Sequence, residues 1–146
     1  LVPGYEPPIY IAWSATNRSP LIRIPVTRGA GTRVELRCPD PAANPYLVLA
    51  VCLEAGLDGI RNQITPPDAV TENVFEMQLQ QRAKLGIESL PGDLEQAVEE
   101  LEKDDYIKNV LGGHITEKYL EAKRAEWADY RAQVTEWEIE KYLYKI

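Results

Sequence analysis

The sequence predicts an α+β fold, with short antiparallel strands in its first third and a mainly α-helical region after them. Three observations predict it. Residues 33–38 alternate between charged and apolar side chains, as in a strand with one buried face. Glycines between residues 27 and 32 mark a turn before this strand. From residue 44 onward, prolines, glycines and capping residues bound stretches with helical spacing.

Three strands are expected before residue 40. Residues 9–13 form an apolar run after two prolines, and residues 21–25 form a second short apolar stretch. The third strand, at 33–38, is the clearest, and its two faces differ. Its apolar face, which we expect to meet a core, holds Val34, Leu36 and Cys38. Its charged face holds Arg33, Glu35 and Arg37 and presents a cation, an anion and a cation along one line.

Helices are expected from residue 44 to the end of the chain. Asn44 and Pro45 open an apolar stretch that should form a buried helix and close near Gly56 and Gly59. The expected organisation is therefore a flap loop and active-site strands in residues 1–40, followed by a helical region with a C-terminal tail in residues 41–146.

Later helix boundaries follow from capping residues. Asp93, with a glutamine three residues later, resembles a capping box, and Thr135 with Glu138 resembles a second one. A Gly-Gly pair at 112–113 should break the chain, after which Thr116 is expected to cap a long helix. The apolar tail is too hydrophobic for a free end.

Composition and charge exclude some classes of function. The net charge of −7 argues against a nucleic-acid binder. Residues 1–37 hold five arginines against two acidic residues, a balance of +3, so the remainder carries −10. No apolar run approaches a membrane span, and two cysteines predict no disulfide framework, which favours the cytoplasm. Because the chain opens at Leu1, we expect further sequence upstream.

The charged face of this strand has two possible interpretations. Arg33, Glu35 and Arg37 could form a solvated face with cross-strand ion pairs. Alternatively they could form an anion site with one carboxylate for a divalent metal, as ATP–Mg chemistry requires. Arg18 and Arg23 on the neighbouring segment favour the anion site, because clustered arginines repel one another without an anion between them.

Glu6 also has two readings. It lies in a loop that three prolines stiffen and Gly4 loosens. A glutamate in a loop is usually only solvated. The alternative is a lid that brings a carboxylate over a bound substrate.

Several long motifs resemble those of glutamine synthetases. Residues 1–8 (LVPGYEPP) resemble the family's glutamate loop, and residues 17–25 (NRSPLIRIP) resemble its arginine-rich ATP motif. Residues 33–46 resemble the strand and turn that follow, and residues 126–127 and 134–138 resemble its C-terminal helices. The match spans nearly the whole chain in order. It is similar to the C-terminal part of the catalytic domain of a bacterial type I enzyme.

The resemblance implies roles on the ATP side of an active site. Arg18 corresponds to the arginine that stabilises the transferring phosphoryl group. Arg23 and Arg33 match arginines that contact ATP phosphates. Glu35 matches a ligand of the divalent metal, Mg²⁺ or Mn²⁺.

The resemblance also implies roles on the glutamate side. Arg37 matches the arginine that pairs with the substrate α-carboxylate, and Glu6 matches the flap glutamate that closes over glutamate and helps deprotonate ammonium. The reaction implied joins glutamate and ammonia at the expense of ATP, through γ-glutamyl phosphate. Other metal carboxylates of the family lie upstream, so the chain alone is expected to be inactive.

Partners are implied in the same way. The family forms a dodecamer of two hexameric rings, and the C-terminal segment inserts into the opposite ring. Residues 85–91 lack the tyrosine that some members adenylylate. This absence indicates the Gram-positive-like class, which is regulated by feedback and by partner proteins.

Two alternatives stay open. One is a ligase of the same fold that joins glutamate to a polyamine instead of ammonia. The other is a non-catalytic module for assembly and partner docking.

Overall fold

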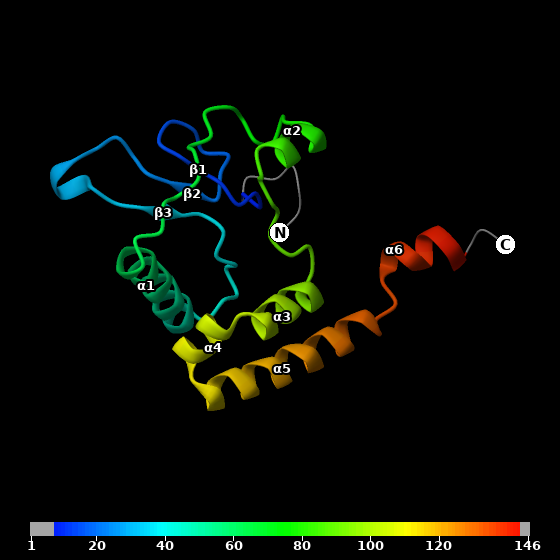
Figure 1. The fold of residues 1–146 in the computed structure, drawn as a ribbon. Coiled ribbons are helices and arrows are strands. Elements are labelled where there is room, and N and C mark those ends of the chain that lie inside the picture. The colour runs from blue at the N-terminus through cyan, green and yellow to red at the C-terminus, as the bar shows by residue number, and fades with distance from the viewer. Residues whose placement is uncertain (1–7, 144–146) are drawn as a thin grey trace.

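A small sheet followed by helices makes up the computed structural model, which describes residues 8–143 (Figure 1). The early elements are β1 (Trp13–Ser14), β2 (Ile22–Arg23), the 3₁₀ turn η1 (Gly29–Gly31) and β3 (Glu35–Leu36). The later elements are α1 (Pro45–Arg61), α2 (Leu79–Lys84), α3 (Leu94–Lys103), α4 (Asp105–Leu111), α5 (Gly113–Arg131), α6 (Glu136–Glu138) and the π-helical turn η2 (Ile139–Leu143). The predicted fold class, short strands and then helices, is confirmed.

The sheet has the order β1-β2-β3. β2 and β3 pair antiparallel, as predicted, and this register places Arg23 opposite Glu35. β1 and β2 pair in parallel, with Trp13 opposite Ile22, which corrects the prediction of antiparallel strands throughout. The reason is that residues 15–21 loop back toward the start of β1 instead of reversing in a hairpin, so the amides of residues 21, 22 and 24 bond to the carbonyls of residues 10, 12 and 14.

The apolar face of β3 does not meet a core within residues 8–143. Val34 is 65% exposed and Leu36 is 37% exposed, so the expectation of a buried face is wrong for this chain. β3 is an edge strand that pairs only with β2 among the described elements. An exposed apolar edge strand of this kind is commonly covered by another segment of the same protein or by a partner.

The main buried cluster lies beside the sheet rather than under β3. It consists of Ile9, Tyr10, Val74 and Met77. The Tyr10 ring packs against Phe75, with ring centroids 6.0 Å apart. The backbone on either side of Tyr10 pairs with residues 88–90, since Ile11 donates to the carbonyl of Glu88 and Leu90 donates to that of Ile9, both at 2.8 Å. The cluster therefore joins the residues before β1 to the segment around α2.

Helix α1 begins where the sequence predicts it. The side chain of Asn44 accepts hydrogen bonds from the amides of Tyr46 and Leu47, and Pro45 occupies the first turn. The helix continues to Arg61, two residues beyond Gly59, and none of its residues is buried within residues 8–143, so the prediction of a buried helix is wrong. A glycine inside a helix costs only about 1 kcal/mol. Contact with α4, including a 2.9 Å hydrogen bond from the Tyr106 hydroxyl to the Glu54 carbonyl, offsets that cost.

Helix α5 begins at Gly113, three residues before Thr116, so Thr116 is not its cap. Gly112 adopts φ 79° and ψ 153°, a conformation open to glycine, and this allows the early start. Thr116 instead lies buried in the first turn, where its hydroxyl donates to the Lys108 carbonyl of α4 at 3.2 Å.

The two other predicted caps are present, one of them only in part. Asp93 accepts a hydrogen bond from the amide of Gln96, and the Gln96 side chain donates to the Asp93 carboxylate but accepts from the amide of Gly92 instead of that of Asp93. Thr135 and Glu138 form the complete reciprocal box at the start of α6.

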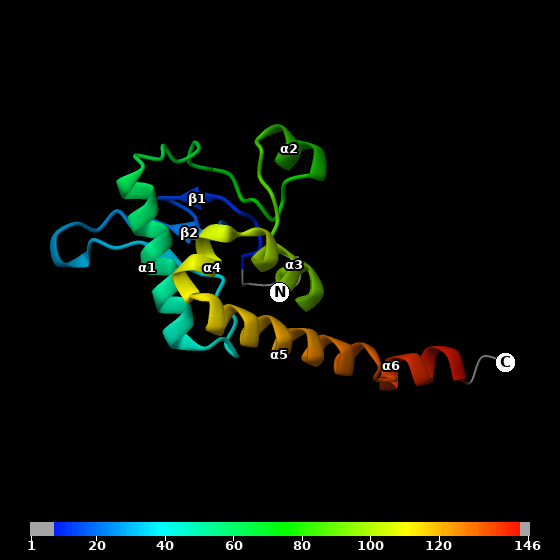
Figure 2. The same cartoon turned by 60° about the horizontal axis from the view of Figure 1, so that its bottom comes forward.

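The helices form one group beyond the sheet. α3 lies beside α5, and α4 contacts α1, α3 and α5. α6 continues beyond the end of α5, away from the rest of the chain, in both views (Figures 1 and 2). In the described part of the chain, no helix combines the length and the apolar character that crossing a membrane requires.

Candidate functional site

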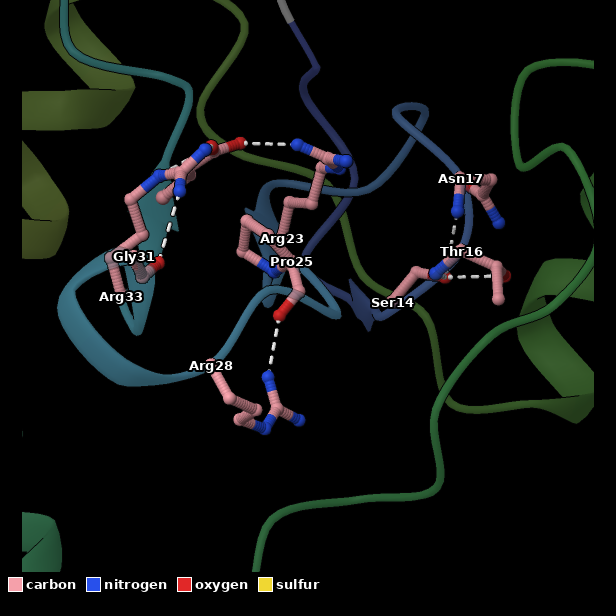
Figure 3. Close-up of polar contacts among 9 residues, drawn as sticks. Ser14, Thr16, Asn17, Arg23, Pro25, Arg28, Gly31 and Arg33 are labelled. Carbon is pink, nitrogen blue, oxygen red and sulfur yellow. Dashed lines mark hydrogen bonds and ion pairs between the residues drawn. The ribbon is translucent and has the colours of Figure 1, made fainter.

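One glutamate on β3 lies between two arginines from different segments. Glu35 receives Arg23 from β2, with Nη1 and Oε2 3.0 Å apart, because the strand register sets the two residues opposite each other. Arg33 approaches the other carboxylate oxygen, with Nη2 and Oε1 2.6 Å apart. Figure 3 shows Arg23 and Arg33, whose guanidinium groups each donate to one oxygen of this carboxylate. Of the alternating charges predicted along the strand, Arg33 and Glu35 are brought together, and Arg23 from the neighbouring strand joins them, whereas Arg37 forms no ion pair within residues 8–143.

The arginines keep Glu35 ionised. The hydrogen bond from Arg23 is the main cause that holds the pKa of the Glu35 carboxyl below its usual value, and Arg33 acts in the same direction, while partial burial opposes both. The group is thus an anion over the whole neutral range and can act as a metal ligand without losing a proton first.

Two buried guanidinium nitrogens have no hydrogen-bond partner among residues 8–143. They are Nε of Arg23 and Nη1 of Arg37. A buried donor without a partner costs roughly 1–3 kcal/mol, and such groups are rare in folded proteins. The cross-strand ion pair alone would fit a solvated strand face, but the unpartnered nitrogens favour a site that awaits an anion.

Arg28 is not part of the cluster. Its guanidinium donates to the carbonyl oxygens of Pro25, at 2.7 Å, and Thr27 and so closes the loop that carries η1 (Figure 3). Gly29 in this loop has φ 72°, which explains a glycine at the predicted turn. Arg28 therefore provides a useful comparison, as an arginine with a local structural role.

Arg18 is exposed on the turn between β1 and β2, apart from the Arg23–Glu35–Arg33 cluster. Within residues 8–143 it forms no ion pair. Its two neighbours, Asn17 and Ser19, are held by hydrogen bonds to residues 70–74, which pattern reasoning missed. The available signal was the Asn-X-Ser spacing, since both side chains readily bond to backbone in turns. Glu6 lies outside the described residues.

Glu35 has no companion metal ligands in the described part of the chain. Residues 8–143 contain no group of three or more His, Cys, Asp or Glu side chains that could hold an ion. Both oxygens of Glu35 are engaged by arginines. The donor set fits a single ligand of a divalent metal, with the other ligands supplied from elsewhere.

One protein-family model covers nearly the whole chain. The family model described as glutamine synthetase, catalytic domain, matches residues 1–142. The chain belongs to the glutamine synthetase family. It is 55% identical over 145 residues to a glutamine synthetase of Clostridium saccharobutylicum, and 56% identical over 144 residues to one of Thermotoga maritima. Each alignment covers 99% of this chain and 33% of the relative, so the chain spans about a third of the length of the synthetases it matches.

Solved structures agree with the fold. The chain resembles GmaS in a complex with ADP, with a TM-score of 0.80 and 40% identity, over 93% of this chain and 30% of that one. It also resembles GmaS without ligand, with a TM-score of 0.76 and 38% identity, over 94% of this chain and 30% of that one. The resemblance expected from the motifs is confirmed at the level of the family.

Proposed function

We propose that the full-length protein joins ammonia to the γ-carboxylate of glutamate, using ATP and passing through γ-glutamyl phosphate, to give glutamine, ADP and phosphate. One observation in the structure carries this proposal. Among the described residues, nitrogens of Arg23 and Arg37 lie buried without partners, and Arg23 pairs with an ionised glutamate, in a chain of the synthetase family. That arrangement suits a ligand with several negative charges and a metal ion.

The residues divide between the two substrates. Arg23 and Arg33 bind phosphates of ATP, while Arg18 stabilises the phosphoryl group in transfer. Arg37, with its unpartnered Nη1, binds the α-carboxylate of glutamate. Glu6 closes over bound glutamate and helps deprotonate ammonium. Guanidinium groups suit these tasks because they remain charged and bind carboxylates and phosphates through paired hydrogen bonds.

The metal would be Mg²⁺ or Mn²⁺, and Glu35 would supply one oxygen ligand. When bound, the ion neutralises phosphate charge during transfer. Arg23 and Arg33 keep Glu35 ionised and orient its carboxylate until ligands arrive. The similarity to the GmaS structure with ADP supports nucleotide use.

A second candidate function differs from the first in the molecule that accepts the γ-glutamyl group. Two relatives named glutamine synthetase, 55% and 56% identical to this chain, support ammonia. The likeness to GmaS shows that the fold is not confined to chains with that name, so a polyamine remains the competing acceptor. A cytoplasmic dodecamer of two rings, with regulatory protein partners, is proposed on the family resemblance.

The test is a product assay on the full-length protein. Purified protein is incubated with ATP, glutamate, metal ion and either ammonium or a polyamine, and products are separated by liquid chromatography. Glutamine formed only with ammonium supports the proposal. A γ-glutamyl polyamine as the main product would replace it with the second candidate, and release of no product from either acceptor would reject both, leaving a docking module.

A further inference from the structure

Arg18 lies on a turn that is anchored on both sides. The preceding residue is held by a 3.2 Å hydrogen bond from the Asn17 amide to Oγ of Ser14, which is almost fully buried. The following residue, Ser19, is also buried, and Pro20 after it is closed off from solvent. Arg18 itself is exposed between them. The backbone at Arg18 is therefore fixed while its side chain remains free to meet a ligand.

The side chain of Asn17 uses both ends of its amide. Its Nδ2 donates to the carbonyl oxygens of Val70, at 3.1 Å, and Glu72, at 3.2 Å. Its Oδ1 accepts from both the amide and the hydroxyl of Ser19, at 3.0 and 2.8 Å. One side chain thus ties residues 70–72 to the residue on the far side of Arg18.

Ser19 completes the link. Its hydroxyl accepts a 2.9 Å hydrogen bond from the amide of Val74, which belongs to the main buried cluster. The backbone of Val70 donates to the Trp13 carbonyl at 2.9 Å, so the same segment is joined to β1 as well. The network connects the Arg18 turn to the core through directional contacts, of which the hydrogen bond between Val74 and Ser19 is buried.

We propose that Asn17 is a positioning residue that, with Ser19, holds Arg18 in place for phosphoryl transfer by tying its turn to residues 70–74. The inference rests on the role given to Arg18 under the proposed function. A charge that stabilises a transition state must be placed before the reaction, and a displacement of about 1 Å can cost roughly a hundredfold in rate. Loss of Asn17 therefore acts on kcat more than on ground-state binding.

The experiment is a double-mutant cycle in the full-length synthetase that carries this sequence. The variants are Asn17→Ala, Arg18→Ala, the two combined, and Asn73→Ala. Asn73 is a matched control, because its side chain bonds only within residues 73–76 of the anchored segment and does not reach the Arg18 turn. For each variant we would measure kcat, KM for ATP and for glutamate, and the midpoint of thermal unfolding.

Positioning predicts a kcat about tenfold or more lower in Asn17→Ala, with KM for ATP changed by less than about threefold. It further predicts near-normal kinetics in Asn73→Ala. In the Arg18→Ala background, loss of Asn17 should cost nothing more, since its effect passes through Arg18.

Four outcomes would overturn the inference. Equal losses in Asn17→Ala and Asn73→Ala, or an undiminished loss in the Arg18→Ala background, would indicate a general structural effect. A large loss in Arg18→Ala with none in Asn17→Ala would remove the positioning role and leave the proposed function intact. Normal activity in Arg18→Ala would instead reject the role of Arg18 itself. If Asn17→Ala fails to fold, Ser19→Ala takes its place in the cycle and the same outcomes decide.

Discussion

Arginine side chains make different kinds of contact at three places in this chain. Arg23 and Arg33 bind the carboxylate of Glu35, and Arg28 closes a loop through backbone carbonyls. Arg37 has a buried nitrogen that finds no partner in the part of the chain that the structure describes. An unpartnered nitrogen gains most when an anion arrives, because a satisfied donor exchanges one hydrogen bond for another. The contrast between Arg37 and Arg28 makes the site assignment testable.

Replacing Arg37 with alanine in the full-length protein should raise KM for glutamate on the order of a hundredfold, since a charge-assisted contact to the substrate carboxylate is lost. KM for ATP should change little. Arg28→Ala, which removes an arginine of local structural role, should leave both values within a few-fold. Steady-state kinetics with each substrate varied in turn would measure this, and similar losses in both variants would refute the assignment.

Glu35 gives the sheet a predictable pH dependence. The folded pKa of Glu35 lies below its usual value of 4.5, so its ion pairs stabilise the fold above that pH and stop doing so as the pH falls through the folded pKa. Wild type should therefore be more stable than Glu35→Gln at pH 6, and the difference should vanish well below pH 4.5. Denaturant midpoints of both proteins from pH 6 to pH 3 would show it. A constant difference down to pH 3 would contradict the ion-pair account.

At the scale of elements, α4 and α5 meet at two glycines with different demands. Gly112 has φ 79° and ψ 153°, in a region that residues with a side chain rarely adopt, while Gly113 is the first residue of α5. A Cβ added at either position would meet nothing within 4 Å. The two positions therefore differ in backbone conformation and not in available space.

Gly112→Ala should lower the free energy of unfolding by about 2 kcal/mol, because alanine is strained at this backbone conformation. Gly113→Ala should be neutral or slightly stabilising, since alanine is the better helix former. Chemical denaturation followed by circular dichroism would measure both. Equal effects of the two substitutions would show that backbone conformation at Gly112 does not set the start of α5.

Local signals predicted those features whose causes are local. Asn44, Asp93 and Thr135 cap helices because their side chains reach amides two or three residues away. The parallel pairing of β1 with β2 depends on the path of the loop between them, which alternation of side chains does not encode. The start of α5 depends on a glycine conformation and on a buried hydroxyl bond to α4.

In the candidate site, too, the sequence predicted the features with local causes and missed those that depend on long-range contacts. Alternation on β3 predicted that Glu35 shares a face with arginines, and the motif resemblance supplied Arg18 and Arg23. The anchoring of the Arg18 turn joins residues more than 50 positions apart, so no local pattern contains it. Long-range hydrogen bonds of this kind become visible only once the chain is folded.

As a whole molecule, the chain exposes more surface than a self-contained domain. Its accessible area is 11,185 Å², whereas a folded monomer of 16.5 kDa typically exposes about 7,500 Å². The excess, about 3,600 Å², falls partly on the apolar face of β3 and partly on outward residues of α1 such as Leu49 and Leu53. An excess of this size is comparable to a large obligate interface.

The end of the chain contributes to this exposed surface. Trp137, Tyr142 and Leu143 are each more than half exposed on the segment that extends beyond α5. We predict that the full-length protein forms the double rings proposed above and that deleting residues 135–146 separates them into single rings, because these apolar side chains are then no longer available for burial between the rings. Mass photometry would measure the size of the particles, and dodecamers that persist after the deletion would refute the prediction.

The most direct test concerns how much of the site this chain contains. We propose that this chain supplies the Arg23–Glu35–Arg33 cluster, Arg37 and Arg18 to the active site. The other metal ligands would come from other parts of the full-length protein, because residues 8–143 hold no group of three candidate ligands. The chain and the full-length protein would be incubated separately with ATP, glutamate, ammonium and metal ion, and phosphate release would be compared with a blank without enzyme. The account predicts turnover by the full-length protein and none by the chain. Turnover by the chain that disappears in Arg18→Ala would contradict it, because the site would then be complete within these 146 residues.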